Sequence, residues 1–312
     1  MSRTGIVLAT VVALAALATP GPAPAVAASA KCTGAAALDA KRPCTNTSRT
    51  FRPSLAKADL VTSSPCKMLR EKPEPVCTFG APASKARRHI ALVGDSHALQ
   101  WRSALDFVAS SQRWQGFSVT APGCPFSDAV KYLAEGIRAP CVEWYHAVLK
   151  WFRRHPEITT VFVSQFAPMP LNLPPGKTEL QVKSAGFRRA WSLLPKTVKR
   201  VIAIRDTPMT TDGTAPCLRA ALAAAASPGP ACRLPRADVV KQDAAVITAR
   251  QLRSKRYGVA DLTSFFCDRA FCFPVVGGVL VYRDTFGHIT LDYARSLGPY
   301  LLRRLRFLGL VR

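Results

Sequence analysis

From residue 89 to its C-terminus the chain alternates short apolar runs rich in β-branched residues with longer amphipathic segments. This alternation is typical of parallel strands joined by crossover helices, which cover both faces of a sheet. Five runs fit strands, at 89–93, 117–120, 159–163, 200–204 and 258–262, and a short extended piece fits 279–282. Helices are expected at 97–111, 141–153, 180–194, 237–256 and 291–307, and the run at 220–226 is either a short helix or a low-complexity loop. The sequence therefore predicts an α/β fold, a three-layer α/β/α sandwich with a central parallel sheet.

The first 30 residues have the features of a secretory signal peptide. Arg3 precedes an apolar run at 6–18, and small residues permit cleavage after Ala27 or Ala30. A membrane anchor is the alternative, but the run is short for a span and prolines follow it. Since no later segment has about 18 uninterrupted apolar residues, we expect a signal peptide at 1–27 and a secreted, extracytoplasmic chain with no transmembrane segment after cleavage.

Residues 28–88 differ in composition from the region that follows them. They contain four cysteines, many Pro, Ser, Thr and Lys residues, and few long apolar stretches. We interpret them as a disulfide-stapled lead-in with little core of its own. Residues 89–312 are long enough for one large domain.

All ten cysteines lie downstream of the expected cleavage site. An even number behind a signal peptide predicts disulfides formed in an oxidising compartment. No CxxC pair or His-x-x-x-His cluster supplies ligands at zinc spacing, so we expect neither a metal nor another cofactor. The sequence leaves the connectivity open, but pairing of neighbours would give five short loops: Cys32–Cys44, Cys66–Cys77, Cys124–Cys141, Cys217–Cys232 and Cys267–Cys272.

The chain is strongly basic, with 43 Lys and Arg residues against 19 acidic ones and a net charge of +24. Such a charge attracts polyanions of any kind. No motif of a nucleic-acid-binding protein accompanies it, so a nucleic-acid partner is not expected. For an exported protein, anionic envelope polymers or lipid headgroups are the expected partners. A basic surface that has no partner is an equally good interpretation of the charge.

Three short motifs follow expected strands or precede the last helix. The string from Gly94 to His97 ends the first strand, Gly123-Cys124-Pro125 ends the second, and Asp284 and His288 precede the closing helix. The carboxyl ends of parallel strands meet at one edge of a sheet, so the fold brings these segments together.

Ser96 has the position of an activated nucleophile. A serine hydroxyl needs a base to take its proton, and the base needs an acid to fix its tautomer. The Ser96 amide also lies at the start of a helix, where backbone N–H groups stabilise an oxyanion. Serine at such a position is often only a helix N-cap. The downstream Asp284 and His288 favour the nucleophile.

These motifs together resemble a known family. Residues 91–98, residues 123–125, and residues 281–284 with His288 are similar to the SGNH domain often fused to membrane-bound acyltransferases of bacterial envelopes. The similarity runs from about residue 59 to the C-terminus and includes the cysteines at 66, 77, 267 and 272. The resemblance implies an SGNH fold and O-acyl ester chemistry on cell-surface glycans. A membrane acyltransferase is then a candidate partner.

The resemblance also implies residue roles: Ser96 as nucleophile, His288 as base, Asp284 as orienting acid, and the amides of Ser96 and Gly123 as oxyanion donors. Two departures matter. The spacing from acid to base is one residue longer than the usual Asp-x-x-His, an insertion that Gly287 can absorb. Asp206 and Asp268 are the alternative acids.

The second departure concerns the third strand, whose end normally supplies an Asn to the oxyanion. Here the chain reads Val163-Ser164-Gln165-Phe166, so Gln165 or Ser164 is the expected donor. Loss of one good oxyanion donor lowers the rate on the order of 10²–10³-fold.

Other polar and aromatic residues have simpler interpretations. We expect Asp95 to brace its turn through backbone hydrogen bonds, and His97 to hydrogen-bond at the helix start rather than act as a second base. Trp101 and Trp144 are expected in the core. The remaining histidines, at 89, 146 and 155, have no partner motif and are expected at the surface or in packing.

The function expected from these motifs is that of a secreted O-acyl esterase or O-acyltransferase acting on acylated envelope glycans through an acyl-enzyme. The alternative is a catalytically weak or inactive SGNH-fold module that binds anionic envelope polymers. A secreted lipase is a third option, for which the sequence shows no lid.

Overall fold

The computed structural model describes Met1 and residues 32–311. Apart from Met1, the expected signal peptide and both of its cleavage positions lie outside the described residues. No helix in the described part of the chain is long and apolar enough to cross a membrane.

A seven-stranded sheet lies at the centre of the fold, in the order β1-β2-β4-β3-β5-β6-β8. Five neighbouring strands, from β4 to β8 in this order, run parallel, and β2 joins β4 antiparallel. All five expected strands form, so the expected fold class is confirmed. The strands of the sheet are β1 Lys67–Leu69, β2 Val76–Gly80, β3 Arg88–Gly94, β4 Trp114–Thr120, β5 Ile158–Ser164, β6 Arg200–Ile204 and β8 Tyr257–Ala260.

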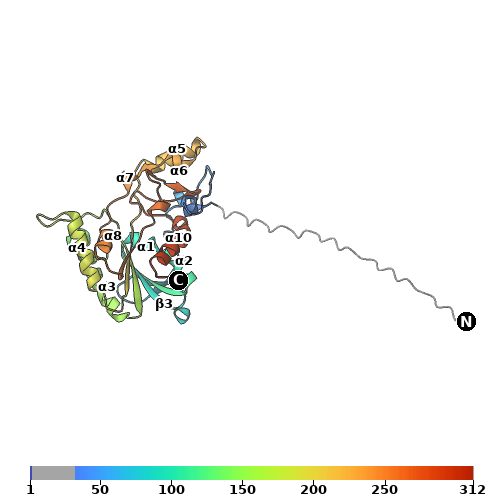
Figure 1. Ribbon diagram of the computed structural model, residues 1–312. Helices are drawn as coiled ribbons and strands as arrows, with labels where there is room; N and C mark the ends of the chain where they lie inside the picture. The colour runs from blue at the N-terminus through green and yellow to red at the C-terminus, as the bar shows by residue number, and fades with distance from the viewer. Residues whose placement is uncertain (2–31, 312) are drawn as a thin grey trace. The chain divides into compact units, whose positions relative to one another are not determined.

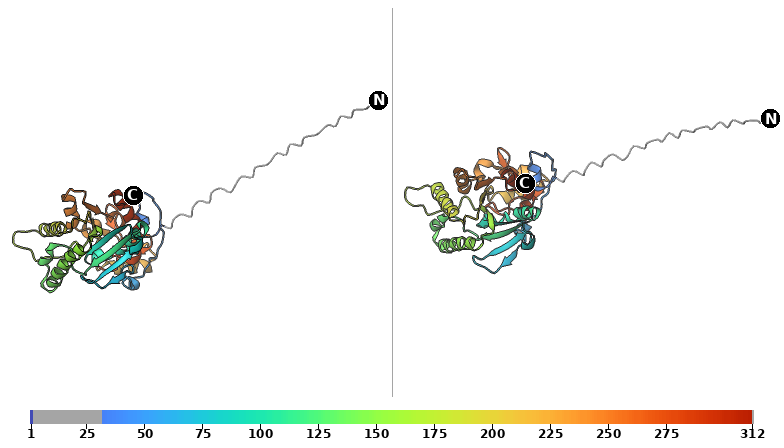
Figure 2. Two further views of the ribbon diagram at one scale, coloured as in Figure 1. Left: turned by 90° about the horizontal axis from the view of Figure 1, so that it is seen from below. Right: turned by 60° about the horizontal axis from the view of Figure 1, so that its bottom comes forward.

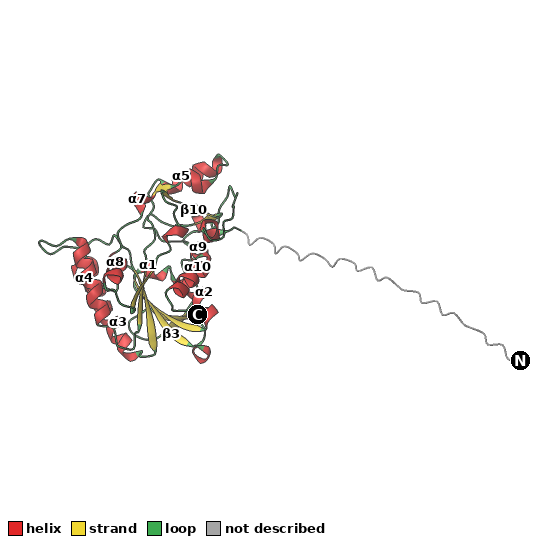
Figure 3. Cartoon of the chain, viewed as in Figure 1, coloured by secondary structure: helices red, strands yellow, loops and turns green. Residues whose placement is uncertain are grey.

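Helices cover both faces of this sheet (Figure 1). Along β3, Ile90 and Leu92 belong to one buried cluster, with residues of α2, α9 and α10. Ala91 and Val93 point into the other, with residues of α3, α4 and α8. This alternation follows from the two-residue period of a strand. The sheet therefore lies between two helical layers, as the secondary-structure colouring of Figure 3 and the views of Figure 2 also show.

The α-helices are α1 Ser96–Leu99, α2 Arg102–Gln112, α3 Glu135–Arg154, α4 Glu179–Ser192, α5 Thr214–Ala223, α6 Pro228–Ala231, α7 Arg236–Val239, α8 Ala244–Gln251, α9 Leu291–Ser296 and α10 Gly298–Phe307. Short 3-10 turns are η1 Gly34–Leu38, η2 Leu55–Lys57, η3 Ala83–Lys85, η4 Asp128–Tyr132 and η5 Thr263–Phe265. Two-residue strands β7 Leu234–Pro235, β9 Phe271–Cys272, β10 Val275–Val276 and β11 Val279–Leu280 complete the fold.

Three of the expected helices are each divided in two. The expected helix at 237–256 becomes α7 and α8, because Asp243 interrupts it: its side chain accepts hydrogen bonds from the amides of Ala245 and Val246 and starts a new helix. The expected helix at 97–111 likewise becomes α1 and α2, and the closing helix becomes α9 and α10. Amphipathic periodicity continues across these breaks, so it does not reveal them.

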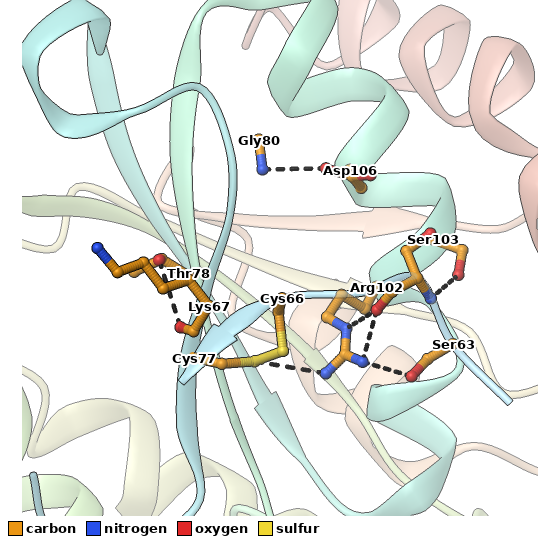
Figure 4. Close-up of a disulfide and its surroundings, with 10 residues drawn as sticks. Ser63, Cys66, Lys67, Cys77, Thr78, Gly80, Arg102, Ser103 and Asp106 are labelled. Carbon is orange, nitrogen blue, oxygen red and sulfur yellow. Dashed lines mark hydrogen bonds between the residues drawn. A yellow bond between two sulfur atoms is a disulfide. The ribbon is translucent and has the colours of Figure 1, made fainter. Parts of the chain in front are cut away.

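Part of the expected lead-in belongs to the sheet, since β1 and β2 extend it beyond β4. Figure 4 shows how this part is attached to α2. The Arg102 guanidinium donates to the Ser64 carbonyl (3.0 and 2.7 Å) and to the Ser63 hydroxyl. The Ser64 amide donates to Ser103 Oγ (2.8 Å), and the Gly80 amide to Asp106 Oδ1 (2.9 Å). These polar contacts add to the burial of Val76 and Phe79, which pack into the two cores of the sheet.

Five disulfides join the ten cysteines, and each links neighbours in the sequence: Cys32–Cys44, Cys66–Cys77, Cys124–Cys141, Cys217–Cys232 and Cys267–Cys272. Trp101 and Trp144 are buried in the two cores. His155 packs against Trp151 and pairs with Glu71 and Glu157.

Candidate active site

The turn that carries Ser96 lies at the carboxyl edge of the sheet, between β3 and α1. A β-carbon at Gly94 would collide with the Ser164 carbonyl oxygen of β5, so the close approach of the two strands requires glycine. Asp95 is fully buried. Its carboxylate accepts from the His97 amide (2.8 Å) and from the Phe166 amide beyond β5 (2.8 Å). Asp95 thereby fixes the turn against the neighbouring strand.

His288 lies between Ser96 and Asp284, although the serine is 192 positions away in the sequence. His288 Nε2 is 2.8 Å from Ser96 Oγ, and its Nδ1 is 2.6 Å from Asp284 Oδ2. Although burial opposes ionisation of Asp284, the hydrogen bond and the charge of His288 lower the pKa of this carboxyl below its usual value. The three side chains form a continuous hydrogen-bonded chain that can move a proton away from the serine.

The longer spacing between acid and base is absorbed in a tight turn. The other oxygen of Asp284 accepts from the amides of Phe286 (3.0 Å) and His288 (3.1 Å). Gly287 has φ +88°, and a β-carbon there would lie 2.5 Å from the Pro208 carbonyl oxygen. Glycine is required at this position by both conformation and space.

The loop after β4 lies beside the serine turn, because the Ala121 amide donates to the Gly94 carbonyl (3.0 Å). The disulfide Cys124–Cys141 fastens this loop to α3. Within the described residues, the amides of Ser96 and Gly123 donate no hydrogen bond, and no atom lies within 4 Å of the β-carbon position of Gly123. Free backbone N–H groups of this kind can stabilise an oxyanion.

Comparison with known proteins identifies the family of the chain. A family model described as the SGNH domain fused to AT3 domains matches residues 65–303. The chain belongs to the SGNH domain family.

This SGNH domain is also similar to a solved structure, the periplasmic domain of a lipopolysaccharide acetyltransferase from Salmonella ser. Paratyphi A. The two share 11% sequence identity and superpose with a TM-score of 0.53, over 73% of this chain and 89% of the other. At this identity the likeness shows the fold alone. A search of curated protein sequences gave no match.

The side chain of Gln165, the expected third oxyanion donor, already has a hydrogen-bond partner in the SGNH domain. Gln165 is buried, and its Nε2 donates to Asp243 Oδ1 (2.9 Å) at the start of α8. Burial raises the pKa of Asp243 to about 6. Ser164 Oγ is buried and has no hydrogen-bond partner among the described residues. The side-chain amide of Gln165 is therefore already bonded to a carboxyl group.

Neither alternative acid binds His288 in the SGNH domain. Asp268 accepts from the amides of Ala270 and Phe271 inside the loop closed by Cys267 and Cys272. Asp206 pairs with His97 instead. The Nδ1 position of His288 is filled by Asp284.

His97 and Asp206 form a second, buried pair that we did not expect. The amide of His97 bonds at the helix start, as expected, but its ring Nδ1 lies 2.6 Å from Asp206 Oδ1. The ring centroids of His97 and His288 are 4.3 Å apart, and His97 Nε2 has no partner among the described residues. Burial opposes the charge of His97, but Asp206 outweighs it and raises the pKa of the imidazole. In the sequence, the one indication of this pair was the position of Asp206 just after β6, at the same edge of the sheet as Ser96.

Proposed function

We propose that this SGNH domain is a serine-dependent O-acyl esterase or O-acyltransferase that acts on acylated cell-envelope glycans. The contact between His288 Nε2 and Ser96 Oγ, backed by Asp284, carries the proposal. The similarity to a domain of a lipopolysaccharide acetyltransferase supports a glycan as substrate. Five disulfides support a location outside the cytoplasm.

The reaction proceeds through an acyl-enzyme. Ser96 Oγ attacks the ester carbonyl carbon while His288 Nε2 takes the hydroxyl proton, and Asp284 stabilises the imidazolium. The amides of Ser96 and Gly123 hold the oxyanion. When the ester C–O bond breaks, His288 returns the proton to the leaving alcohol, and the acyl group stays on Ser96.

The second half-reaction decides between esterase and transferase. His288 now takes a proton from water or from a sugar hydroxyl while the oxygen of that group attacks the acyl carbon. The ester bond to Ser96 Oγ then breaks, and His288 returns the proton to this oxygen. Water gives hydrolysis and the sugar gives transfer. How well the bound acceptor excludes water determines the ratio of the two products.

An inactive module that binds anionic polymers is the second candidate. The observation that favours it is the bond from Gln165 to Asp243, which engages the side chain expected to assist the oxyanion. Turnover measurements separate the two candidates.

The test is hydrolysis of p-nitrophenyl acetate, with labelling by a fluorophosphonate probe. For Ser96→Ala we expect loss of labelling and a fall in kcat on the order of 10³–10⁴-fold or more. Ser111→Ala, at an exposed position in the last turn of α2, is the matched control and should retain both labelling and turnover. Equal turnover in wild type and Ser96→Ala rejects the proposal. Mass spectrometry of an added oligosaccharide then distinguishes acyl transfer from hydrolysis.

A further inference from the structure

A groove of about 590 Å³ lies between η4 and α4, the helix at the left of Figure 1. Its volume is in the range of small-ligand sites. Small and apolar residues line part of it, namely Ala129, Val182, Ala185 and Gly186. The rest of the lining is polar and mostly basic: Lys131, Lys177, Arg188 and Arg189, with Tyr132, Asp128, Gln181 and Pro174.

The groove exists because α4 packs closely on η4. At Gly186 a β-carbon would collide with Ser127 Oγ and would lie 2.6 Å from the Ala129 amide nitrogen. The absence of a side chain at Gly186 lets the backbones approach. The short side chains beside it leave the space that the longer basic residues surround.

Three cations of the groove are not neutralised. Lys131 Nζ pairs with Asp128 (2.7 Å), and Arg188 bonds to the amide oxygen of Gln251 (3.3 Å). Among the described residues, no carboxylate lies within ion-pair distance of Lys177, Arg188 or Arg189. Guanidinium and ammonium groups of this kind bind carboxylates and phosphates. The ring of Tyr132 adds an aromatic surface beside them.

A second, smaller pocket shares one lining residue with the groove. Ala129 also lines a small adjoining pocket with Pro125, Gln165 and Phe166. The Phe166 ring lies 4.9 Å from that of His97 and 5.8 Å from that of Phe286. Phe166 therefore lines the small pocket and also packs near the ring of His97, the residue next to Ser96.

We propose that this groove binds an acidic glycan, through its carboxylate or phosphate groups, and presents a neighbouring sugar to Ser96. The proposal deepens the proposed function and rests on it for the reaction, but the binding itself does not need Ser96.

The experiment measures the Kd of the full domain, by titration calorimetry, for oligogalacturonate, for poly(glycerol phosphate) and for a neutral galactose oligomer. The two acidic probes distinguish the source of the anionic group. The double variant Lys177→Glu, Arg189→Glu is compared with Lys57→Glu, Lys85→Glu, which changes the charge equally. Lys57 and Lys85 are exposed, lie in the 3-10 turns η2 and η3, and do not line the groove.

We expect at least one acidic probe to bind more tightly than the neutral oligomer. The groove variant should weaken this binding about tenfold or more, equivalent to about 1.4 kcal/mol, while the control pair changes it less than about threefold. Tyr132→Ala should weaken it as well, by removing the aromatic surface. Equal losses in the two charge variants indicate general attraction to a basic protein and overturn the proposal, as does the absence of binding by either probe.

The two proposals fail in different ways. If turnover of p-nitrophenyl acetate does not depend on Ser96 but the acidic probe binds selectively in the groove, only the proposed function is overturned. If turnover depends on Ser96 but binding is not selective for the groove, only the proposal of a glycan-binding groove is overturned. Circular dichroism of each variant shows whether the fold is retained.

Discussion

At the scale of single residues, the site depends on which ring nitrogen of His288 carries the proton. Asp284 Oδ2 faces Nδ1, while Oδ1 accepts from two backbone amides. This arrangement places the proton on Nδ1 and leaves Nε2 free to accept from Ser96. The extra residue between acid and base does not disturb the geometry, because Gly287 has a positive φ that residues with a side chain rarely adopt.

For Asp284→Asn we predict a fall in kcat on the order of 10³–10⁴-fold. The amide oxygen will take the place that accepts from the backbone, so the NH₂ group will face Nδ1 and force the proton onto Nε2. Steady-state hydrolysis of p-nitrophenyl acetate measures the loss. Asp268→Asn serves as the control. Near wild-type activity in Asp284→Asn would show that another group orients the imidazole.

His97 shows what a residue-level interpretation lacks. The residue directly follows the nucleophile, and its ring pairs with Asp206 beneath His288. The sequence predicts that His97 and Asp206 lie at the same edge of the sheet. It does not predict that their side chains are hydrogen-bonded.

At the scale of elements, loops fastened by disulfides surround the site. Cys124–Cys141 holds the Gly123 loop on α3, whereas Cys217–Cys232 joins α5 to the end of α6, apart from the sheet in Figure 1. The two cross-links close loops of similar length, 17 and 15 residues. Their effects on stability should therefore be similar, and their effects on catalysis different.

We predict that Cys124→Ala, Cys141→Ala and Cys217→Ala, Cys232→Ala each lower the free energy of unfolding by about 3 kcal/mol. Only the first pair should also lower kcat at temperatures where both proteins are folded, because it releases the Gly123 amide. Urea unfolding and ester hydrolysis measure the two quantities. A matching loss of kcat in the second pair would contradict a specific role for the Gly123 loop.

At the scale of the whole molecule, an ion pair joins the two ends of the described chain. Asp39 follows η1, and its two oxygens accept from the Arg303 guanidinium of α10, both at 2.8 Å, over 264 positions. The hydrogen bond from Arg303 outweighs the burial of Asp39 and lowers the pKa of this carboxyl. Within the described residues, the end of η1 is thereby held against α10.

This pair gives stability a defined pH dependence. Because the pKa of Asp39 is lower in the folded state, the ionised group stabilises the fold above the unfolded pKa of about 3.9, and this contribution is lost as the pH falls through the folded value. We predict that Asp39→Asn lowers the free energy of unfolding by about 1–3 kcal/mol at pH 7, and that its difference from wild type shrinks as the pH falls below about 4. Urea denaturation at pH 3 to 7 tests this, with exposed Asp212→Asn as control. A difference that stays constant with pH would rule out the ion pair as its source.

The sequence by itself determined the strands, most of the helices, the family, and the segments that meet at the sheet edge. Each of these can be recognised from the periodicity of a few neighbouring residues or from a short motif. In β3, for example, residues are buried on both faces of the strand, so the whole run is apolar. The breaks at Asp243 and near Leu297 escaped prediction because amphipathic spacing continues across them.

Only the tertiary structure decided which side chains touch. His288 is hydrogen-bonded to Asp284, His97 to Asp206, and Gln165 to Asp243. A basic groove lies beside Gly186. These contacts join positions far apart in the chain, and their distances depend on how helices and loops pack. Local sequence patterns hold no information about ångström-scale separations between such segments, because the packing of the entire core sets them.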